Sequence, residues 1–93
     1  MFVGVLQVEL SIPNAYSLKN KHHVLKGLLE KIHQDFTMST TKMDRLDVWN
    51  SAILGVAFVS NDARHAQSHL QRVLNAMERG RDAVVADAQI EVF

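Results

Sequence analysis

Hydrophobic and polar residues alternate strictly at the start of the chain, which is the pattern of a strand with one buried face. The residues predicted to face inward are Phe2, Gly4, Leu6, Val8, Leu10 and Ile12, and those opposite are Gln7, Glu9 and Ser11. Pro13 has no amide hydrogen for a sheet ladder, so we expect the strand to end before it. Ser17 then has the side chain of a good helix N-cap.

After Ser17 the hydrophobic residues recur at helical spacing, and they predict a helix over residues 17–35. Its buried stripe is formed by Leu18, Leu25, Leu28, Leu29, Ile32 and Phe36. Residues 37–43 are rich in Thr and place Met38 and Thr40 on one face, which indicates an edge strand. Residues 44–47 are polar and predict a connection, whereas residues 49–60 are hydrophobic on both faces and predict a central strand.

The last third of the chain predicts a helix followed by a strand. Ser60, Asn61 and Asp62 supply caps for the helix, and Gly80 is expected to end it in the left-handed conformation. The buried stripe of this helix is formed by Ala66, Leu70, Val73, Leu74 and Met77. In the final strand, strict alternation places Val84, Ala86, Ala88, Ile90 and Val92 inward and Asp87, Gln89 and Glu91 outward.

This order of elements predicts a ferredoxin-like βαββαβ fold of the α+β class, with two helices on one face of a four-stranded antiparallel sheet. We expect one domain over residues 1–93, with the first and third strands at the centre of the sheet. The other sheet face is then uncovered, and its predicted residues are Gln7, Glu9, Ser51, Ile53, Ala57, Val59, Gln89 and Glu91. This mixture fits contact either with water or with a second subunit.

The composition is that of a globular protein, because 47% of the 93 residues are hydrophobic and 22% are charged. The longest hydrophobic run, residues 52–59, is too short to cross a bilayer, so we expect no membrane contact. Without Cys or a recognisable secretion signal, the chain is expected to be cytoplasmic. A chain of this size has a limited core, which favours a homo-oligomer.

The formal net charge is zero, yet the charges are unevenly distributed. Residues 17–35 hold four lysines and two acids, while residues 82–93 hold three acids and no base, so a dipolar molecule is predicted. The candidate nucleic-acid or anion-binding residues are Lys19, Lys21, His22, His23 and Lys26, because such cations can contact phosphate. The alternative is an ordinary solvated helix face.

Other candidate chemistry is weaker. His65 and His69 have a spacing that suits a metal, but apart from Asp62 no third ligand is near, so we predict two surface histidines, no metal and no cofactor. The sequence shows no nucleophile paired with a base and no glycine-rich phosphate loop, and an enzyme is not expected. The outward strand positions lack the paired aromatics that stack RNA bases. We expect Trp49 to pack at a strand end, with an interface role as the alternative, and Met38, Met43 and Met77 to fill the core.

The chain resembles the bacterial YlxP-like family, a conserved domain of unknown function. The resemblance rests on an ordered set of landmarks: Val3-Gly4-Val5-Leu6, Ile12-Pro13, Ser17-Leu18-Lys19-x-Lys21, Leu25, Leu28-Leu29, Phe36, Trp49, Gly55-Val56-Ala57 and Val59-Ser60-Asn61-Asp62. It implies a ferredoxin-like fold and a small cytoplasmic protein whose genes often lie near those for ribosome-binding and initiation factors. In two places the chain departs from the family pattern, with His22 and His23 where arginines are usual and Lys42 where an acid is usual.

The leading hypothesis is therefore an RNA- or ribosome-associated accessory factor that contacts phosphate through its basic first helix. The alternative is a homo-oligomeric interaction module that uses the open sheet face and the edge strand over residues 37–43. A third hypothesis, a small ligand enclosed by the sheet faces of a dimer, rests on fold analogy alone.

Overall fold

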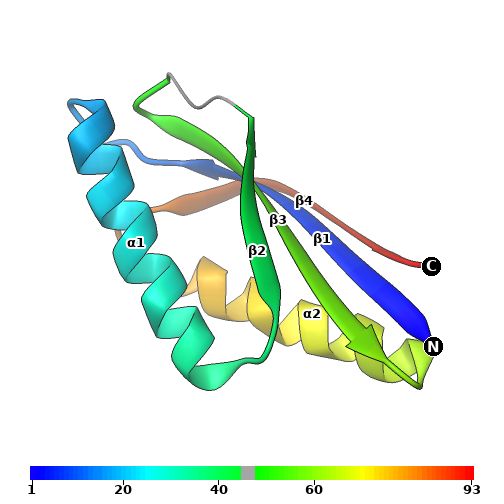
Figure 1. Ribbon diagram of the computed structural model, residues 1–93. Coiled ribbons are helices and arrows are strands. Elements are labelled where there is room, and N and C mark those ends of the chain that lie inside the picture. Colours follow the sequence, from blue (N-terminus) through cyan, green and yellow to red (C-terminus); the bar gives the residue numbers. More distant parts are fainter. Residues whose placement is uncertain (45–47) are drawn as a thin grey trace.

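The computed structural model describes residues 1–44 and 48–93, and it contains the six predicted elements in the predicted order (Figure 1). They are β1 (Phe2–Ser11), α1 (Leu18–Asp35), β2 (Ser39–Asp44), β3 (Ser51–Ser60), α2 (Ala63–Glu78) and β4 (Val84–Val92). All strand pairs are antiparallel in the order β2-β3-β1-β4, which confirms the ferredoxin-like fold and its central pair. Of the connection predicted over residues 44–47, Asp44 ends β2 and the rest lies outside the described residues.

The core lies between the sheet and the two helices, which cover the same sheet face (Figure 1). Leu6, Val8 and Leu10 of β1 are fully buried, as the alternation predicts. They belong to one cluster with Leu25 and Ile32 of α1 and with Leu70, Val73, Leu74 and Met77 of α2. Each fully buried side chain of this size stabilises the fold by about 1.5–3 kcal/mol relative to exposure.

Close packing of α2 on β1 depends on Gly4. A Cβ atom added there would lie 2.7 Å from Leu70 Cδ1 and 3.3 Å from Ala66 Cβ. The missing side chain therefore allows a helix with a small residue at position 66 to approach the sheet backbone.

The helix starts follow the prediction, but the end of α2 does not. Ser17 accepts a hydrogen bond from the Asn20 amide at 3.1 Å, and Asp62 Oδ1 accepts one from the Arg64 amide at 2.8 Å. The prediction of a left-handed conformation at Gly80 is wrong, because the φ angle of Gly80 lies outside the left-handed region. The helix ends instead with a right-handed residue, Arg79, and the Gly80 amide donates to the Met77 carbonyl at 3.1 Å.

A β-bulge changes which residues of β4 face inward. The register with β1 shifts between Glu9 and Leu10, so that Val85 pairs with Leu10 and Val84 with Ser11. The prediction that Val84 and Ala86 face the core is wrong: both are exposed, and Val85 packs there instead. The extra residue of the bulge reverses the alternation on which the prediction depended.

The segments that flank the β2–β3 connection differ from the prediction. Strand β3 begins at Ser51, so Trp49 precedes it and is 52% exposed, and its predicted packing role is wrong. Met38 and Met77 pack in the core as expected, but Met43 is half exposed. Its sulfur lies over Gly55, where an added Cβ atom would come within 2.8 Å of it.

Candidate anion-binding cleft

Four of the five predicted anion-binding residues lie on the surface of α1, and one does not. Lys19, His22, His23 and Lys26 are exposed. Lys21 is only 1% exposed, and its Nζ donates a hydrogen bond to the Val48 carbonyl oxygen at 2.6 Å. The prediction that Lys21 contacts phosphate is therefore wrong. Its ammonium instead links α1 to the segment just before β3. The sequence carried a signal, because position 21 is one helical turn before Leu25 and belongs to the buried stripe.

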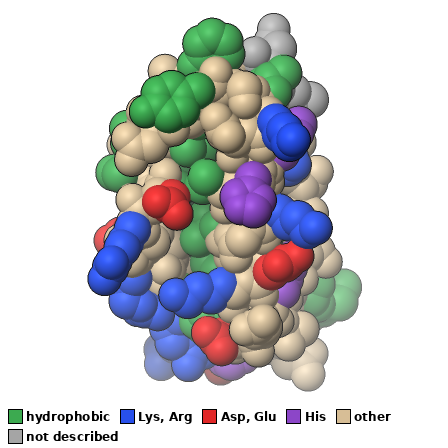
Figure 2. All heavy atoms as spheres, turned by 90° about the vertical axis from the view of Figure 1, so that its left-hand side faces the viewer, with side chains coloured by type: hydrophobic (Ala, Val, Ile, Leu, Met, Phe, Trp, Pro, Cys, Tyr) green, Lys and Arg blue, Asp and Glu red, His purple; other side chains and the backbone are tan. Residues whose placement is uncertain are grey.

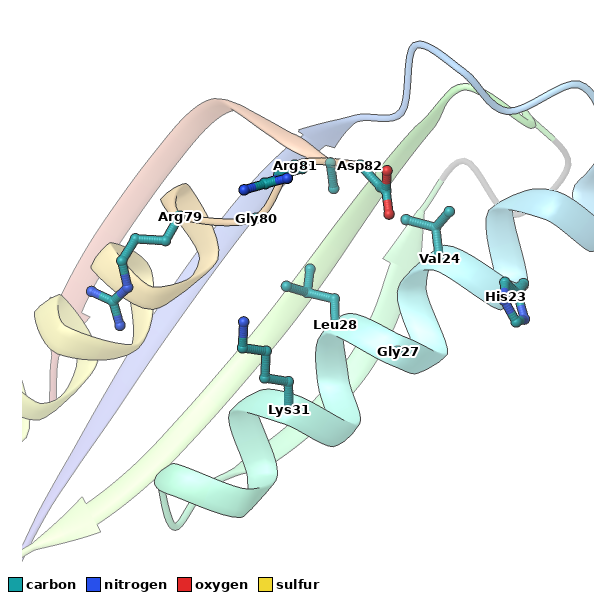
Figure 3. A pocket seen from close by; sticks show the side chains of 10 residues that line it. His23, Val24, Gly27, Leu28, Lys31, Arg79, Gly80, Arg81 and Asp82 are labelled. Carbon is teal, nitrogen blue, oxygen red and sulfur yellow. The ribbon is translucent and has the colours of Figure 1, made fainter.

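A cleft of about 390 Å³ lies between α1 and the connection from α2 to β4. The side chains of Lys31 and Leu28 extend from α1 towards this connection, which carries Arg79 and Arg81 (Figure 3). The complete lining consists of His23, Val24, Gly27, Leu28, Lys31, Arg79, Gly80, Arg81, Asp82 and Ala83. Two segments that are about 50 residues apart in the sequence thus form the two walls.

The cleft is electropositive. Lys31, Arg79 and Arg81 carry positive charges, and Asp82 is the acid in the lining. Within the described part of the chain, none of the three cations forms an ion pair or a side-chain hydrogen bond. Their donors are consequently available to an anion from outside.

Viewed from this side, the molecule has a hollow with hydrophobic side chains in its floor, and along its edges lie Lys, Arg and His side chains with Asp and Glu side chains among them (Figure 2). The hydrophobic lining residues are Val24, Leu28 and Ala83. A ligand that fits this surface has an anionic group that contacts the cations and a hydrophobic part that contacts the floor.

Sequence reasoning missed three of the residues that make this cleft. Lys31 contributes to the predicted charge of the first helix but is not among the predicted site residues, and neither are Arg79 and Arg81. The available signal was the pair of arginines around Gly80, directly after a predicted helix end. Only the packing of α2 beside α1 shows that these arginines face Lys31.

The histidines of α2 have different environments. His65 is exposed, but His69 is 8% exposed, so the prediction of two surface histidines is wrong for His69. Its Nε2 is 2.9 Å from the Thr37 carbonyl oxygen, and its ring stacks on Phe58 with 3.8 Å between centroids. Position 69 continues the stripe of buried residues along α2. Among residues 1–44 and 48–93, no group of three or more His, Asp or Glu side chains could hold a metal.

The uncovered sheet face is the second feature that could bind a partner. The strand register places all eight predicted residues on this face, which confirms their orientation. A hydrophobic hollow of about 290 Å³ lies over its centre, and its lining includes Val5, Thr41, Met43, Gly55 and Ala57. Asp87 and Glu91 of β4 are exposed on the same face.

The architecture defines the class of protein first: it is an α+β protein with a ferredoxin-like fold. A de novo designed protein with ferredoxin fold, solved by solution NMR, matches with a TM-score of 0.58 at 14% sequence identity. The match covers 100% of this chain and 84% of that one, and at this identity it shows the fold alone. None of the helices in the described residues is long and hydrophobic enough to span a membrane.

The sequence then places the chain in a family. A family model described as "Protein of unknown function (DUF503)" matches residues 3–90, and the chain belongs to this family. It is 35% identical over 72 residues to "Uncharacterized protein YlxP" of Bacillus subtilis (strain 168), which covers 77% of this chain and 78% of that protein. The predicted YlxP-like membership is therefore confirmed.

Proposed function

We propose that the protein is an RNA-binding accessory factor, associated with ribosomal RNA or ribosomal particles, that contacts phosphates with its helical side. The observation that supports this is the convergence of cations that have no ionic partner among the described residues: Lys31 of α1 faces Arg79 and Arg81 across the cleft. Lys19 and Lys26 extend the positive surface along α1. RNA is the partner with a regular row of negative charges that such a surface fits.

The zero formal net charge is compatible with this proposal. A polyanion responds to the local potential of the surface that it approaches, and Asp87 and Glu91 lie on the open sheet face, away from α1. The translation-linked gene neighbourhood implied by the family resemblance makes ribosomal RNA the first RNA to test.

The decisive experiment measures binding to ribosomal RNA and to small ribosomal subunits over a range of salt concentrations. The variant Lys19→Glu/Lys26→Glu is compared with Lys42→Glu/Arg64→Glu, which makes the same change in net charge on exposed residues of β2 and α2. If each lysine contacts one phosphate of a single strand, the slope of log K against log salt falls by about 0.7 per contact, or about 1.4 for both.

If the two double variants weaken binding equally, the effect comes from net charge alone, and the proposal that RNA contacts α1 is contradicted. Wild-type protein without any salt-sensitive binding would overturn the function itself. Lys21 is left unchanged in both variants, because its replacement by Glu would disturb the fold and mimic a loss of binding.

A second candidate function is self-association through the open sheet face and the edge strand β2. The hydrophobic hollow around Val5, Met43 and Ala57 favours it, because a second copy would remove this surface from water. Light scattering is expected to show an oligomer that Ala57→Lys converts to a monomer. A wild-type protein that stays monomeric at high concentration would exclude this function.

A further inference from the structure

The lining of the cleft changes in character along α1. His23 and Val24 mark one end and Lys31 the other, and seven to eight helical residues span about 11 Å. In Figure 3, Lys31 and Arg79 lie towards one end, Asp82 lies beside Val24 at the other, and Leu28 extends between them. The cleft therefore has a cationic end and an end with a hydrophobic surface and one carboxylate.

Gly27 lines the cleft without a side chain. A Cβ atom at Gly27 would meet no atom within 4 Å, so this stretch of α1 leaves room for a flat group against Val24 and Leu28. The volume of about 390 Å³ is at the small end of the range of ligand pockets, which is about 300–1,000 Å³.

We infer that this cleft holds one unpaired nucleotide of the bound RNA, an inference that rests on the proposed function. The phosphate lies on Lys31, Arg79 and Arg81, and the base lies against Val24, Leu28 and Ala83. The carboxylate of Asp82 repels phosphate and accepts a hydrogen bond from an amino group of the base, which sets the orientation.

Two other anionic ligands fit less well. An acidic peptide would engage the cations but leave the hydrophobic floor in contact with water. The bases of an RNA duplex are paired and stacked, so a base could enter a cleft of this size only after it had left the duplex stack. The protein is therefore expected to prefer single-stranded over double-stranded RNA.

The test closes the cleft without changing its charge. Gly27→Phe projects a ring from an exposed helix position with open space around it, and Gly27→Ala is the matched control. Both substitutions favour helix formation, by up to about 1 kcal/mol for Gly27→Ala, so circular dichroism should show the native fold. Binding of a ten-nucleotide single strand and of the duplex of the same sequence is measured by fluorescence anisotropy at low salt.

The inference predicts that Gly27→Phe weakens single-strand binding by roughly tenfold, as expected for the loss of one base contact, while Gly27→Ala changes it little. The variant should bind the duplex like the wild type. Titration of the wild type with cytidine monophosphate should shift the amide NMR signals of Gly27 and Gly80, and the shift of the Gly80 signal should disappear in Gly27→Phe.

The outcomes separate the two proposals. If Lys19→Glu/Lys26→Glu weakens RNA binding but Gly27→Phe leaves single-strand binding unchanged, the RNA-binding function stands and the nucleotide cleft is overturned. If the wild type binds neither strand in a salt-dependent way, the function fails. Shifts caused by a glutamate peptide instead of the nucleotide would overturn the inference in favour of a protein ligand.

Discussion

The helical side and the open sheet face of this protein carry opposite charge. Around the cleft, Lys31, Arg79 and Arg81 are unpaired among the described residues, and α1 adds further exposed lysines. On the open sheet face, β4 contributes Asp87 and Glu91 around a hydrophobic centre. A chain with zero formal net charge thus presents one surface suited to a polyanion and another suited to a hydrophobic partner.

This difference also shows that a fold does not specify how it is used. Many RNA-binding domains with a four-stranded sheet stack bases on aromatic residues of the open face. In β1, β3 and β4 the residues on the open face are aliphatic or polar, and Phe93, directly after β4, adds an aromatic ring beside Val5 and Gln89. The cations lie on the helices instead, so RNA contact is better supported on the covered side of the molecule.

The largest expected effect is a loss of stability on replacing Lys21, the lysine of α1 that is buried and does not belong to the exposed basic surface. Lys21→Glu places a carboxylate where the ammonium donates to the Val48 carbonyl, and it should lower the free energy of unfolding by about 3–5 kcal/mol. Lys19→Glu, on the exposed side of the same turn, should change it by less than about 0.5 kcal/mol. Urea denaturation measures both, and equal stabilities would contradict the buried position of Lys21.

Substitutions at two glycines compare how tightly the covered and the open face of the sheet are packed. Gly4→Ala adds a methyl group against the buried Leu70 and should cost about 1–3 kcal/mol of stability. Gly55→Ala meets the flexible, half-exposed Met43, which can move aside, so its cost should stay below about 1 kcal/mol. Thermal unfolding of the two variants provides the measurement, and a larger cost at Gly55 would mean that the open face is packed.

Charge reversal on each side tests which surface meets RNA. Arg79→Glu/Arg81→Glu should weaken binding to single-stranded RNA by about tenfold or more and lower the salt slope by about 1.4. Asp87→Lys/Glu91→Lys on the open face should leave affinity unchanged or raise it slightly. Fluorescence anisotropy at several salt concentrations distinguishes them, and a larger loss from the β4 variant would reverse the assignment of the surfaces.

The smallest effect concerns two adjacent histidines. A ring N–H of an exposed imidazole can donate a hydrogen bond to a phosphate oxygen, so removing an imidazole that contacts RNA should lower the affinity by a fewfold. His23 lines the cleft beside Val24, with Lys31 and Asp82 in the same lining, whereas His22 lies on α1 outside it. In fluorescence anisotropy, His23→Ala should therefore lower RNA affinity more than His22→Ala, and an equal loss would argue against the cleft.

Much of the fold followed from local patterns. Alternation in β1, the Ser17 and Asp62 caps, and the helical stripes appear in the structure where they were predicted, apart from Phe2 and Leu18, which were predicted to be buried and are each 38% exposed. The errors occur where local patterns are interrupted, as at the bulge opposite Glu9, or where a residue type suggests the wrong environment, as for Lys21 and His69. A buried lysine or histidine is stable only when tertiary partners satisfy its polar atoms, and these partners are distant in sequence.

The sequence by itself determined the order of the elements, the covered and open faces of the sheet, and the excess of cations on the first helix, because periodicity and charge are properties of neighbouring residues. The tertiary structure alone decided which cations act together. It buries the side chain of Lys21 and places Lys31 across the cleft from Arg79 and Arg81. The physical reason is that a cleft is formed by helix packing, and the meeting of residues 23–31 with residues 79–83 has no counterpart in any local pattern.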